Sequence, residues 1–209
     1  MNYNYEKVKR IFDLVIAGAG LLLLAPFFLL TALLIRLETP GPAFFRQERA
    51  GKNGRPFRIF KFRSMAHVPK PVHGYQEQDD PCITRVGHWL RRFSIDELPQ
   101  LINVLIGEMS LIGPRPALPH QVERYDSRQR RRLQVRPGMT GWAQVNGRNN
   151  ISWEEKIGFD LWYVEHHSLQ IDLYILIKTI WVVLSQSGIY FRGRGSAWRS
   201  SSADEGNRI

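Results

Sequence analysis

The hydrophobic and polar positions separate an N-terminal apolar segment from a mixed remainder. No charged residue occurs from Leu14 to Ile35, and about 20 apolar residues suffice for a helix to cross the hydrocarbon core of a membrane. Basic residues lie on both sides of this segment, at Lys7, Lys9, Arg10, Arg36, Arg46, Arg49 and Lys52. Because cytoplasmic flanks of membrane segments collect Lys and Arg, both ends are expected on the cytoplasmic side.

Pro26 lies near the middle of the apolar segment. A proline inside a helix removes a backbone donor and clashes with the preceding turn, so it can bend the helix. A helix that enters the membrane, bends at Ala25–Pro26 and leaves on the same side keeps both basic flanks cytoplasmic. Residues 1–38 are therefore predicted to form a re-entrant membrane helix. The main alternative is a helix that simply spans the membrane. A cleaved signal peptide fits less well because no A-x-A site follows, and a buried core helix fits less well because the segment has no polar face.

The pattern after residue 38 predicts an α/β fold that is mainly helical, with a small β-hairpin. Thr39–Pro42 ends the first helix. Two short aromatic-rich runs, Ala43–Gln47 and Phe57–Arg63, flank Gly51–Gly54 as the strands of a hairpin would. His67–Pro81 is rich in Pro, Gly and polar residues, which predicts a loop.

Helical patterns follow in the second half of the chain. Short helices are predicted at Arg85–Phe93 and Glu97–Ile106, and a capping box at Ser152–Glu155 begins a helix that runs to about His166. The next predicted helix, Leu169–Ser185, is apolar nearly all round. This composition fits either a position in the membrane interface or burial in the core.

Segments rich in Pro and Gly divide the remaining chain. Leu111–Pro119 and Arg136–Gly141 are predicted to be ordered turns. From Arg192 onward the sequence is basic and rich in Gly and Ser, which predicts disorder. The chain is thus expected to comprise the membrane helix at 1–38, a domain at 39–190 and a tail at 191–209.

The net charge of +10 and the pI near 10.1 call for a negatively charged partner. Nucleic acid, anionic lipid and a phosphorylated substrate all meet that need, and a basic surface that faces only solvent is the alternative. The membrane segment favours lipid headgroups and a phosphorylated substrate over nucleic acid. The single cysteine, Cys82, excludes an internal disulfide and agrees with a reducing compartment.

The adjacent carboxylates of Asp96 and Glu97 are the strongest candidates for chemistry. They follow a basic stretch and precede Pro99, which places a helix start near Asp96 because proline is tolerated only in the first turn. Asp96 then either caps this helix or faces an electropositive space that suits a phosphate. In the second case Asp96 can attack phosphorus, and Glu97 can bind Mg²⁺.

From Lys9 to about Gly188 the chain resembles the monotopic phosphoglycosyl transferases of the bacterial sugar transferase family. The motifs that carry the resemblance, in the family's order, are Lys9–Asp13, Phe60–Met65, Asp96–Leu101, Met109–Pro116, Val135–Gly141 and Gln144–Arg148. The chain departs from many members at the bend, where Ala25 replaces the usual Ser before Pro26. The hydroxyl that could bond the carbonyl freed by the proline is therefore absent.

The resemblance implies a reaction, a cellular location and a set of partners. A sugar 1-phosphate passes from a UDP-sugar to undecaprenyl phosphate with release of UMP, as the first membrane step of glycan assembly. The family's nucleophile maps to Asp96, and its Mg²⁺-binding glutamate maps to Glu97. The implied location is the cytoplasmic face of the bacterial inner membrane. The implied partners are the two substrates and inner-leaflet lipids, without nucleic acid, and a homodimer is left open.

The resemblance also implies supporting residues. Arg91 matches a phosphate-binding arginine of the family, and the other candidates for the diphosphate or the lipid phosphate are Lys61, Arg63, Arg115, Arg136 and Arg148. Asp160 and Asp172 match family carboxylates, and their apolar surroundings indicate either a functional or an ion-paired role. Arg128 and Arg130–Arg132 are expected to face headgroups or solvent instead.

Two other functions fit the residues taken without the resemblance. A membrane-tethered basic module would bind anionic lipid or nucleic acid without catalysis, and it would release no UMP. A glycosyl transferase that acts directly on a lipid would release UDP. The identity of the nucleotide product separates the three functions.

Overall fold

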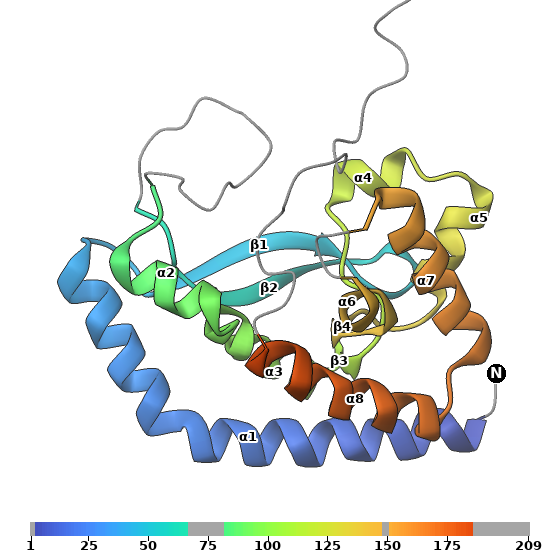
Figure 1. Ribbon diagram of the computed structural model, residues 1–209, viewed down its shortest axis with the longest axis horizontal. Helices are drawn as coiled ribbons and strands as arrows, with labels where there is room; N and C mark the ends of the chain where they lie inside the picture. Colours follow the sequence, from blue (N-terminus) through green and yellow to red (C-terminus); the bar gives the residue numbers. More distant parts are fainter. Residues whose placement is uncertain (1–2, 67–81, 148–150, 186–209) are drawn as a thin grey trace, which may run out of the picture.

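The fold is organised by one long helix, α1 (Tyr3–Glu38), which runs along one side of the molecule and bends within its length (Figure 1). The computed structural model describes residues 3–66, 82–147 and 151–185. Pro26 lies inside α1, and the bend agrees with the loss of a backbone donor there. Within these described ranges, α1 alone is long and apolar enough to cross a membrane. The predicted loop at His67–Pro81 and the tail at 191–209 lie outside the described residues.

Charged side chains fix the N-terminal half of α1 to the rest of the chain. Arg10 donates to two carbonyl oxygens in the last turn of α3 (Leu101–Ile106), at 2.6 and 2.9 Å. Asp13 is only 3% exposed, and it accepts a hydrogen bond from the backbone N–H of Leu111 at 3.0 Å. This half of the apolar helix is therefore docked on protein.

The C-terminal end of α1 holds the start of α2 (Arg85–Arg92). The two carboxylate oxygens of Glu38 accept from the backbone N–H groups of Arg85 at 2.7 Å and Val86 at 3.0 Å. An anion at a helix N-terminus satisfies free backbone donors and is favoured by the helix dipole. Helix α1 thus contacts both α2 and α3, which lie on either side of the 3-10 helix η2 (Ile95–Gln100).

The hairpin predicted between residues 43 and 63 is confirmed. Strands β1 (Phe44–Ala50) and β2 (Pro56–Phe62) pair in antiparallel fashion, and the register places Phe45 opposite Lys61. Residues that face each other across an antiparallel pair share one side of the sheet, and alternate residues of a strand do so as well. Arg49 therefore lies on the Lys61 side of the hairpin.

A second, parallel strand pair lies within the segments that were expected to be turns. Strand β3 (Ser110–Ile112) pairs with β4 (Gly138–Thr140). A Cβ atom on Gly138 would lie 2.1 Å from the backbone nitrogen of Gly113, so glycine is required for this close approach. Strands of three residues are too short to show an alternating pattern, which is why the sequence did not indicate them.

Helices make up most of the remaining structure. The capping box at Ser152–Glu155 is confirmed and begins α7 (Trp153–His166), and α8 (Leu169–Leu184) follows. The stretch predicted as one helix at Glu97–Ile106 is divided between η2 and α3, and Pro99, which has no N–H to donate, lies at this change. The other short helices are η1 (Lys52–Gly54), α4 (Pro119–Glu123), α5 (Ser127–Arg130), η3 (Arg131–Gln134) and α6 (Trp142–Asn146).

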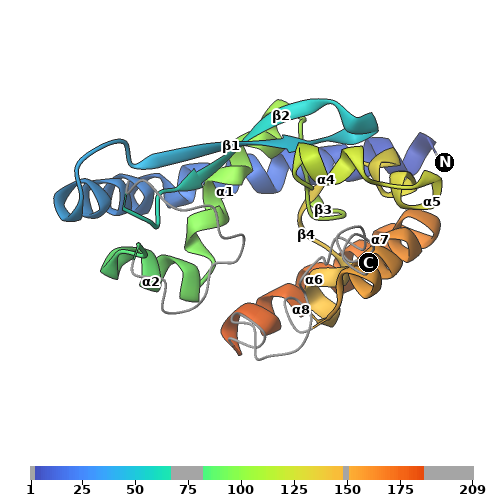
Figure 2. The same cartoon turned by 90° about the horizontal axis from the view of Figure 1, so that it is seen from above.

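Figure 2 shows the hairpin and α1 on one side of β3 and β4, and α7 and α8 on the other. Helix α8 buries Ile175 completely, in a core cluster that also contains Val104 and Met109. Its other side exposes large apolar and aromatic side chains, namely Leu173, Tyr174, Ile177, Ile180, Trp181 and Leu184. Helix α8 therefore has one side in the core and one apolar side that the described protein leaves uncovered.

Gly87 of α2 lies against the backbone of Ser64, where a Cβ atom would come 2.0 Å from the carbonyl oxygen. We expect Gly87→Ala to destabilise the fold by about 1–3 kcal/mol, because overpacking displaces α2. The melting temperature of the detergent-solubilised protein measures this effect. Gly158→Ala in α7 is the matched control, because its Cβ meets no neighbouring segment and loss of a helix glycine stabilises by about 1 kcal/mol. Equal melting temperatures for Gly87→Ala and wild type would contradict the close approach.

Candidate active site

Three segments that are distant in the sequence meet at the carboxylate of Glu97 in η2. Lys61 of β2 donates to Oε1 at 2.7 Å. Arg115, which follows β3, donates through Nη2 to Oε1 at 2.5 Å and through Nη1 to Oε2 at 3.1 Å. A bidentate pair of this kind fixes the geometry of both groups. The side chain of Arg115 is still 50% exposed, so a ligand can reach it.

The two neighbouring carboxylates have different acidities. Burial alone would raise the pKa of Glu97, but Arg115 and Lys61 hold this pKa well below its usual range. Burial, together with the charge of Glu97, raises the pKa of Asp96 to about 6, although Lys61, Arg91 and Arg115 oppose the rise. Asp96 is therefore mostly ionised at neutral pH, in agreement with the expectation from the sequence. Environments that separate two acidities in this way give the two groups different roles.

Asp96 does not serve as a helix cap. Helix η2 begins at Ile95, its N-cap position is Ser94, and Asp96 lies inside the first turn. The carboxylate of Asp96 accepts no hydrogen bond from the part of the chain that the structure describes. Ser94 has a φ of 55°, in the left-handed region that residues other than glycine rarely adopt, and this turn leads the chain from α2 into η2. The capping role that was open for Asp96 is thereby excluded.

Arg91 approaches the carboxylate pair from α2. Its Nε donates to the hydroxyl of Ser64 at 2.9 Å, and its charge lowers the pKa of Asp96. The structure thus brings together three of the six residues predicted to bind phosphate, namely Lys61, Arg91 and Arg115. Arg148, another of the six, lies outside the described residues.

Arg63 contacts the end of α1 instead. It is buried, and its guanidinium donates to the carbonyl oxygens of Thr39 and Pro40, each at 2.7 Å. A positive charge is favourable beside the free carbonyl groups at a helix C-terminus. The structure therefore corrects the expectation that Arg63 binds phosphate, because this buried guanidinium instead fixes the end of α1 to β2.

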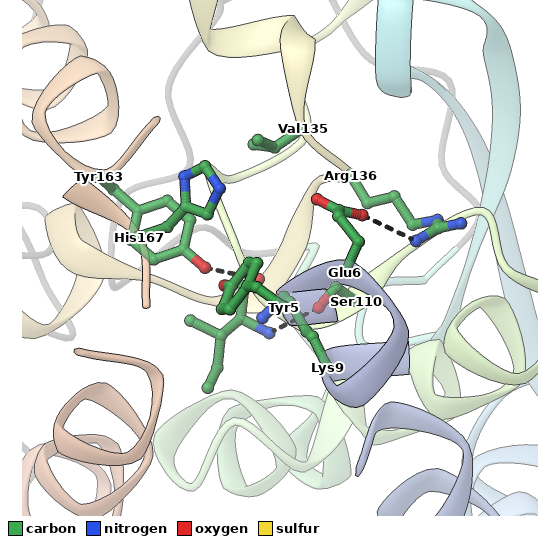
Figure 3. A pocket seen from close by; sticks show the side chains of 9 residues that line it. Tyr5, Glu6, Lys9, Ser110, Val135, Arg136, Tyr163 and His167 are labelled. Carbon is green, nitrogen blue, oxygen red and sulfur yellow. Dashed lines mark hydrogen bonds and ion pairs between the residues drawn. The ribbon is translucent and has the colours of Figure 1, made fainter. Parts of the chain in front are cut away.

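Arg136 and Asp172 lie near the N-terminal end of α1. Figure 3 shows Arg136 beside Glu6, at 3.7 Å, in a small pocket that Lys9 and Tyr163 also line. Asp172 of α8 accepts from Lys9 at 2.6 Å and from the hydroxyl of Tyr163 at 2.7 Å. Of the two roles left open for Asp172, the structure shows ion pairing, which joins α1 to α8. Arg136 pairs with Glu6 in the described structure, and its role at the diphosphate or the lipid phosphate stays a prediction.

Asp160 of α7 is 2% exposed and forms an ion pair with Arg132, which is also buried. The expectation that Arg132 faces headgroups or solvent is therefore wrong, since a buried charge needs a partner and finds one here. Arg132 also donates to the hydroxyl of Tyr125 at 2.6 Å and to the carbonyl oxygen of Arg115 at 3.0 Å. The buried pair thus contacts the backbone of a residue that binds Glu97.

Two further cations lie beside Arg115, and sequence reasoning did not single them out. Arg49 of β1 donates to the carbonyl oxygen of Pro116 at 3.3 Å, and burial and the charge of Arg115 lower its pKa to about 10. Burial and Arg115 also lower the pKa of Lys156 in α7. The alternation of the hairpin, which places Arg49 on the Lys61 side, was the available signal.

The carboxylate pair offers part of a Mg²⁺ site. Within residues 3–66, 82–147 and 151–185, no three His, Cys, Asp or Glu side chains cluster as metal ligands. Mg²⁺ usually keeps several waters and binds through one or two carboxylates together with substrate phosphates. Glu97 keeps lone pairs beyond those used by its cations, and Asp96 has no described partner. The residues therefore fit a metal ion that binds together with a phosphorylated substrate.

Comparisons with known proteins show the family to which the chain belongs. The sequence profile of the family described as Bacterial sugar transferase matches residues 4–186. The chain is 46% identical over 182 residues to the uncharacterized sugar transferase EpsL of Bacillus subtilis, a match that covers 87% of this chain and 90% of that protein. It is 41% identical to the exopolysaccharide production protein ExoY of Sinorhizobium fredii, with 87% and 88% covered.

A third relative is named for its reaction. The UDP-glucose:undecaprenyl-phosphate glucose-1-phosphate transferase of Escherichia coli is 42% identical over 186 residues, which are 83% of this chain and 39% of that protein. The chain therefore spans less than half of this relative, whereas it spans most of EpsL and ExoY. The profile match contains the Asp96–Glu97 pair, its cations and nearly all of α1. This chain belongs to the bacterial sugar transferase family.

Proposed function

We propose that the protein transfers a sugar 1-phosphate from a UDP-sugar to undecaprenyl phosphate through a covalent intermediate on Asp96. The observation that carries this proposal is the carboxylate of Asp96, which accepts no hydrogen bond from the described residues and lies beside Glu97, which Lys61 and Arg115 hold in place. The substrate class rests on the relatives, of which one is named for glucose 1-phosphate transfer and another, from Aeromonas hydrophila, for N-acetylgalactosamine phosphate transfer.

In the first step, a carboxylate oxygen of Asp96 attacks the phosphorus that carries the sugar. The bond between this phosphorus and the bridging oxygen of the diphosphate breaks, and that oxygen leaves with UMP and the electron pair. Lys61, Arg91 and Arg115 are close enough to Asp96 to offset its charge. Such a transfer depends on positioning and charge neutralisation more than on proton transfer.

In the second step, a phosphate oxygen of undecaprenyl phosphate attacks the same phosphorus. The acyl phosphate bond to Asp96 breaks, the carboxylate is restored, and the product is an undecaprenyl-diphosphate sugar. When bound with the donor, Mg²⁺ supplies further charge neutralisation at the phosphates, with Glu97 as its protein ligand. Because both steps use Asp96, UMP must leave before the lipid phosphate can take its place.

The proposal places the site at the cytoplasmic face of the inner membrane. Its support is the two basic flanks of α1, the bend in this helix and the apolar side chains that α8 leaves exposed. Helix α2, which leads to Asp96, exposes Trp89 beside Phe27 of α1, with ring centroids 6.4 Å apart. Tryptophan is enriched at the membrane–water interface, so this end of the site is suited to receive a lipid phosphate.

Replacement of the nucleophile tests the reaction. We expect Asp96→Asn to abolish release of UMP and to yield no labelled protein when a donor radiolabelled in the sugar is supplied alone, whereas wild type becomes labelled. Asp126→Asn is the matched control, because Asp126 caps α5 and asparagine caps a helix equally well. Turnover that survives in Asp96→Asn, or release of UDP in place of UMP, would refute the proposed function.

The buried Arg132–Asp160 pair is expected to support the site through the backbone of Arg115. Asp160→Asn leaves an uncompensated buried charge and should destabilise the protein by about 3–5 kcal/mol. The double variant Arg132→Met with Asp160→Leu should recover most of this loss but transfer phosphosugar more slowly, because the Arg115 carbonyl has lost its donor. Melting temperatures and UMP release measure the two effects. Wild-type turnover in the double variant would show that the pair only stabilises the fold.

The re-entrant path of α1 is tested by labelling in cells. Single cysteines are introduced by Asn4→Cys and by Glu48→Cys in a Cys82→Ser background, one on each side of the apolar segment. Both cysteines should resist an impermeant thiol reagent in intact cells and react after permeabilisation. Reaction of one of them in intact cells would instead show that α1 spans the membrane.

A further inference from the structure

The positive side of the site extends beyond the residues that bind Glu97. Arg49 lies four residues along β1 from Phe45, which is opposite Lys61, a displacement of about 13 Å on the same side of the hairpin. Arg115 lies between them, because its guanidinium binds Glu97 while the carbonyl of the next residue, Pro116, accepts from Arg49. These side chains therefore form a row that leads away from the carboxylate pair.

Lys156 approaches the same row from α7. It is one helical turn before Asp160, so both side chains lie on the same face of this helix. Asp160 pairs with Arg132, and Arg132 donates to the carbonyl oxygen of Arg115. Lys156 therefore lies on the face of α7 that Asp160 and Arg132 connect to the backbone of Arg115, and the charge of Arg115 is one of the causes that lower its pKa.

The cations of this row exceed the carboxylates beside them. Lys61, Arg91, Arg115, Arg49 and Lys156 carry five positive charges, and Asp96 and Glu97 carry two negative charges. Asp160 does not offset the excess because Arg132 already neutralises it. Among these described residues the positive charges exceed the negative charges by three, and Arg49 and Lys156 are the two cations that do not act on Asp96. The diphosphate of a nucleotide sugar, which is a diester, carries two negative charges.

Arg49 has donors beyond those that its protein contacts use. Its Nη2 donates to the side chain of Gln47 at 2.6 Å and its Nη1 reaches Pro116 at 3.3 Å, but its buried Nε has no partner in the described structure. A guanidinium has five N–H donors, and the contacts with Gln47 and Pro116 use one on each Nη atom, so each Nη atom keeps a second N–H for a ligand. Gln47 orients the guanidinium, whose planar donors match phosphate oxygens.

We propose that Arg49 and Lys156 bind the phosphate of the uridine nucleotide, on the side of the diphosphate away from Asp96. The inference rests on the proposed function, which places the sugar-linked phosphorus at Asp96. The phosphate that becomes part of UMP then lies along the row, between Arg115 and the two added cations. Arg49 and Lys156 stabilise the charge that the bridging oxygen gains as it leaves.

Direct titration of UMP into the detergent-solubilised full chain tests this assignment. We expect Arg49→Gln and Lys156→Gln each to raise the dissociation constant of UMP about tenfold, because each variant removes a charged partner of the phosphate. Arg58→Gln is the matched control. Arg58 lies on β2 but on the opposite side of the hairpin from Arg49, where it pairs in register with Glu48. Its loss should leave UMP binding unchanged.

The outcomes separate a ligand contact from a structural role. The contacts that hold the Pro116 segment come from Arg49 and Arg132 and not from Lys156. Lys156→Gln therefore shows whether UMP is bound by these cations even if Arg49→Gln fails to fold. Wild-type UMP affinity in Lys156→Gln, or an equal loss of affinity in Arg58→Gln, would overturn the proposal. The proposal is also overturned if the variants bind UMP normally but undecaprenyl phosphate attacks the preformed intermediate more slowly. The two cations would then bind the lipid phosphate.

This result is independent of the test of the nucleophile. UMP binding is measured without turnover, so binding that depends on Arg49 and Lys156 in a protein that transfers no phosphosugar would refute only the proposed function. If transfer requires Asp96 but UMP affinity is unchanged in both cation variants, only the assignment of Arg49 and Lys156 to the UMP phosphate is refuted.

Discussion

The contact between Glu97 and its two cations is the constraint on which the site depends. It joins β2, η2 and the segment after β3 at one carboxylate, and it keeps that carboxylate ionised despite its burial. The adjacent Asp96 is left with a raised pKa and without a hydrogen-bond donor from the described residues. Without Lys61 and Arg115, two neighbouring carboxylates in one partly buried site would both favour protonation. The cations therefore allow Asp96 to stay ionised while its carboxylate accepts no hydrogen bond from the described residues.

The apolar helix α1, which is long and apolar enough to cross a membrane, also contributes to the candidate site. Arg10, in its N-terminal half, donates to carbonyl groups at the end of α3, and Glu38, at its other end, accepts from the first N–H groups of α2. Helices α2 and α3 enclose η2, which carries Asp96. The segment that carries Asp96 is thus held at both ends by one helix, and the bend in α1 helps set the distance between these two attachments.

The basic residues of this chain have several different roles. Arg63 binds carbonyl groups at the end of α1, and Arg132 is buried beside Asp160. Only a subset gathers near Asp96, and Arg49 and Lys156 extend that subset toward the position proposed for the nucleotide. The net charge therefore does not describe a single binding surface. Buried guanidinium groups are held by carboxylates and carbonyl oxygens, because an unpaired charge inside the protein is costly.

Local patterns in the sequence determined much of the structure. The apolar segment with Pro26, the hairpin around Gly51–Gly54 and the capping box at Ser152 each depend on neighbouring residues, so each was predictable. The Asp96–Glu97 pair was also evident from its motif. Only the tertiary structure decided which arginines reach that pair, that Arg132 is buried and that β3 and β4 pair. These outcomes depend on contacts between residues far apart in the chain, where identical side chains become partners of a carboxylate, a carbonyl group or solvent according to how the elements pack.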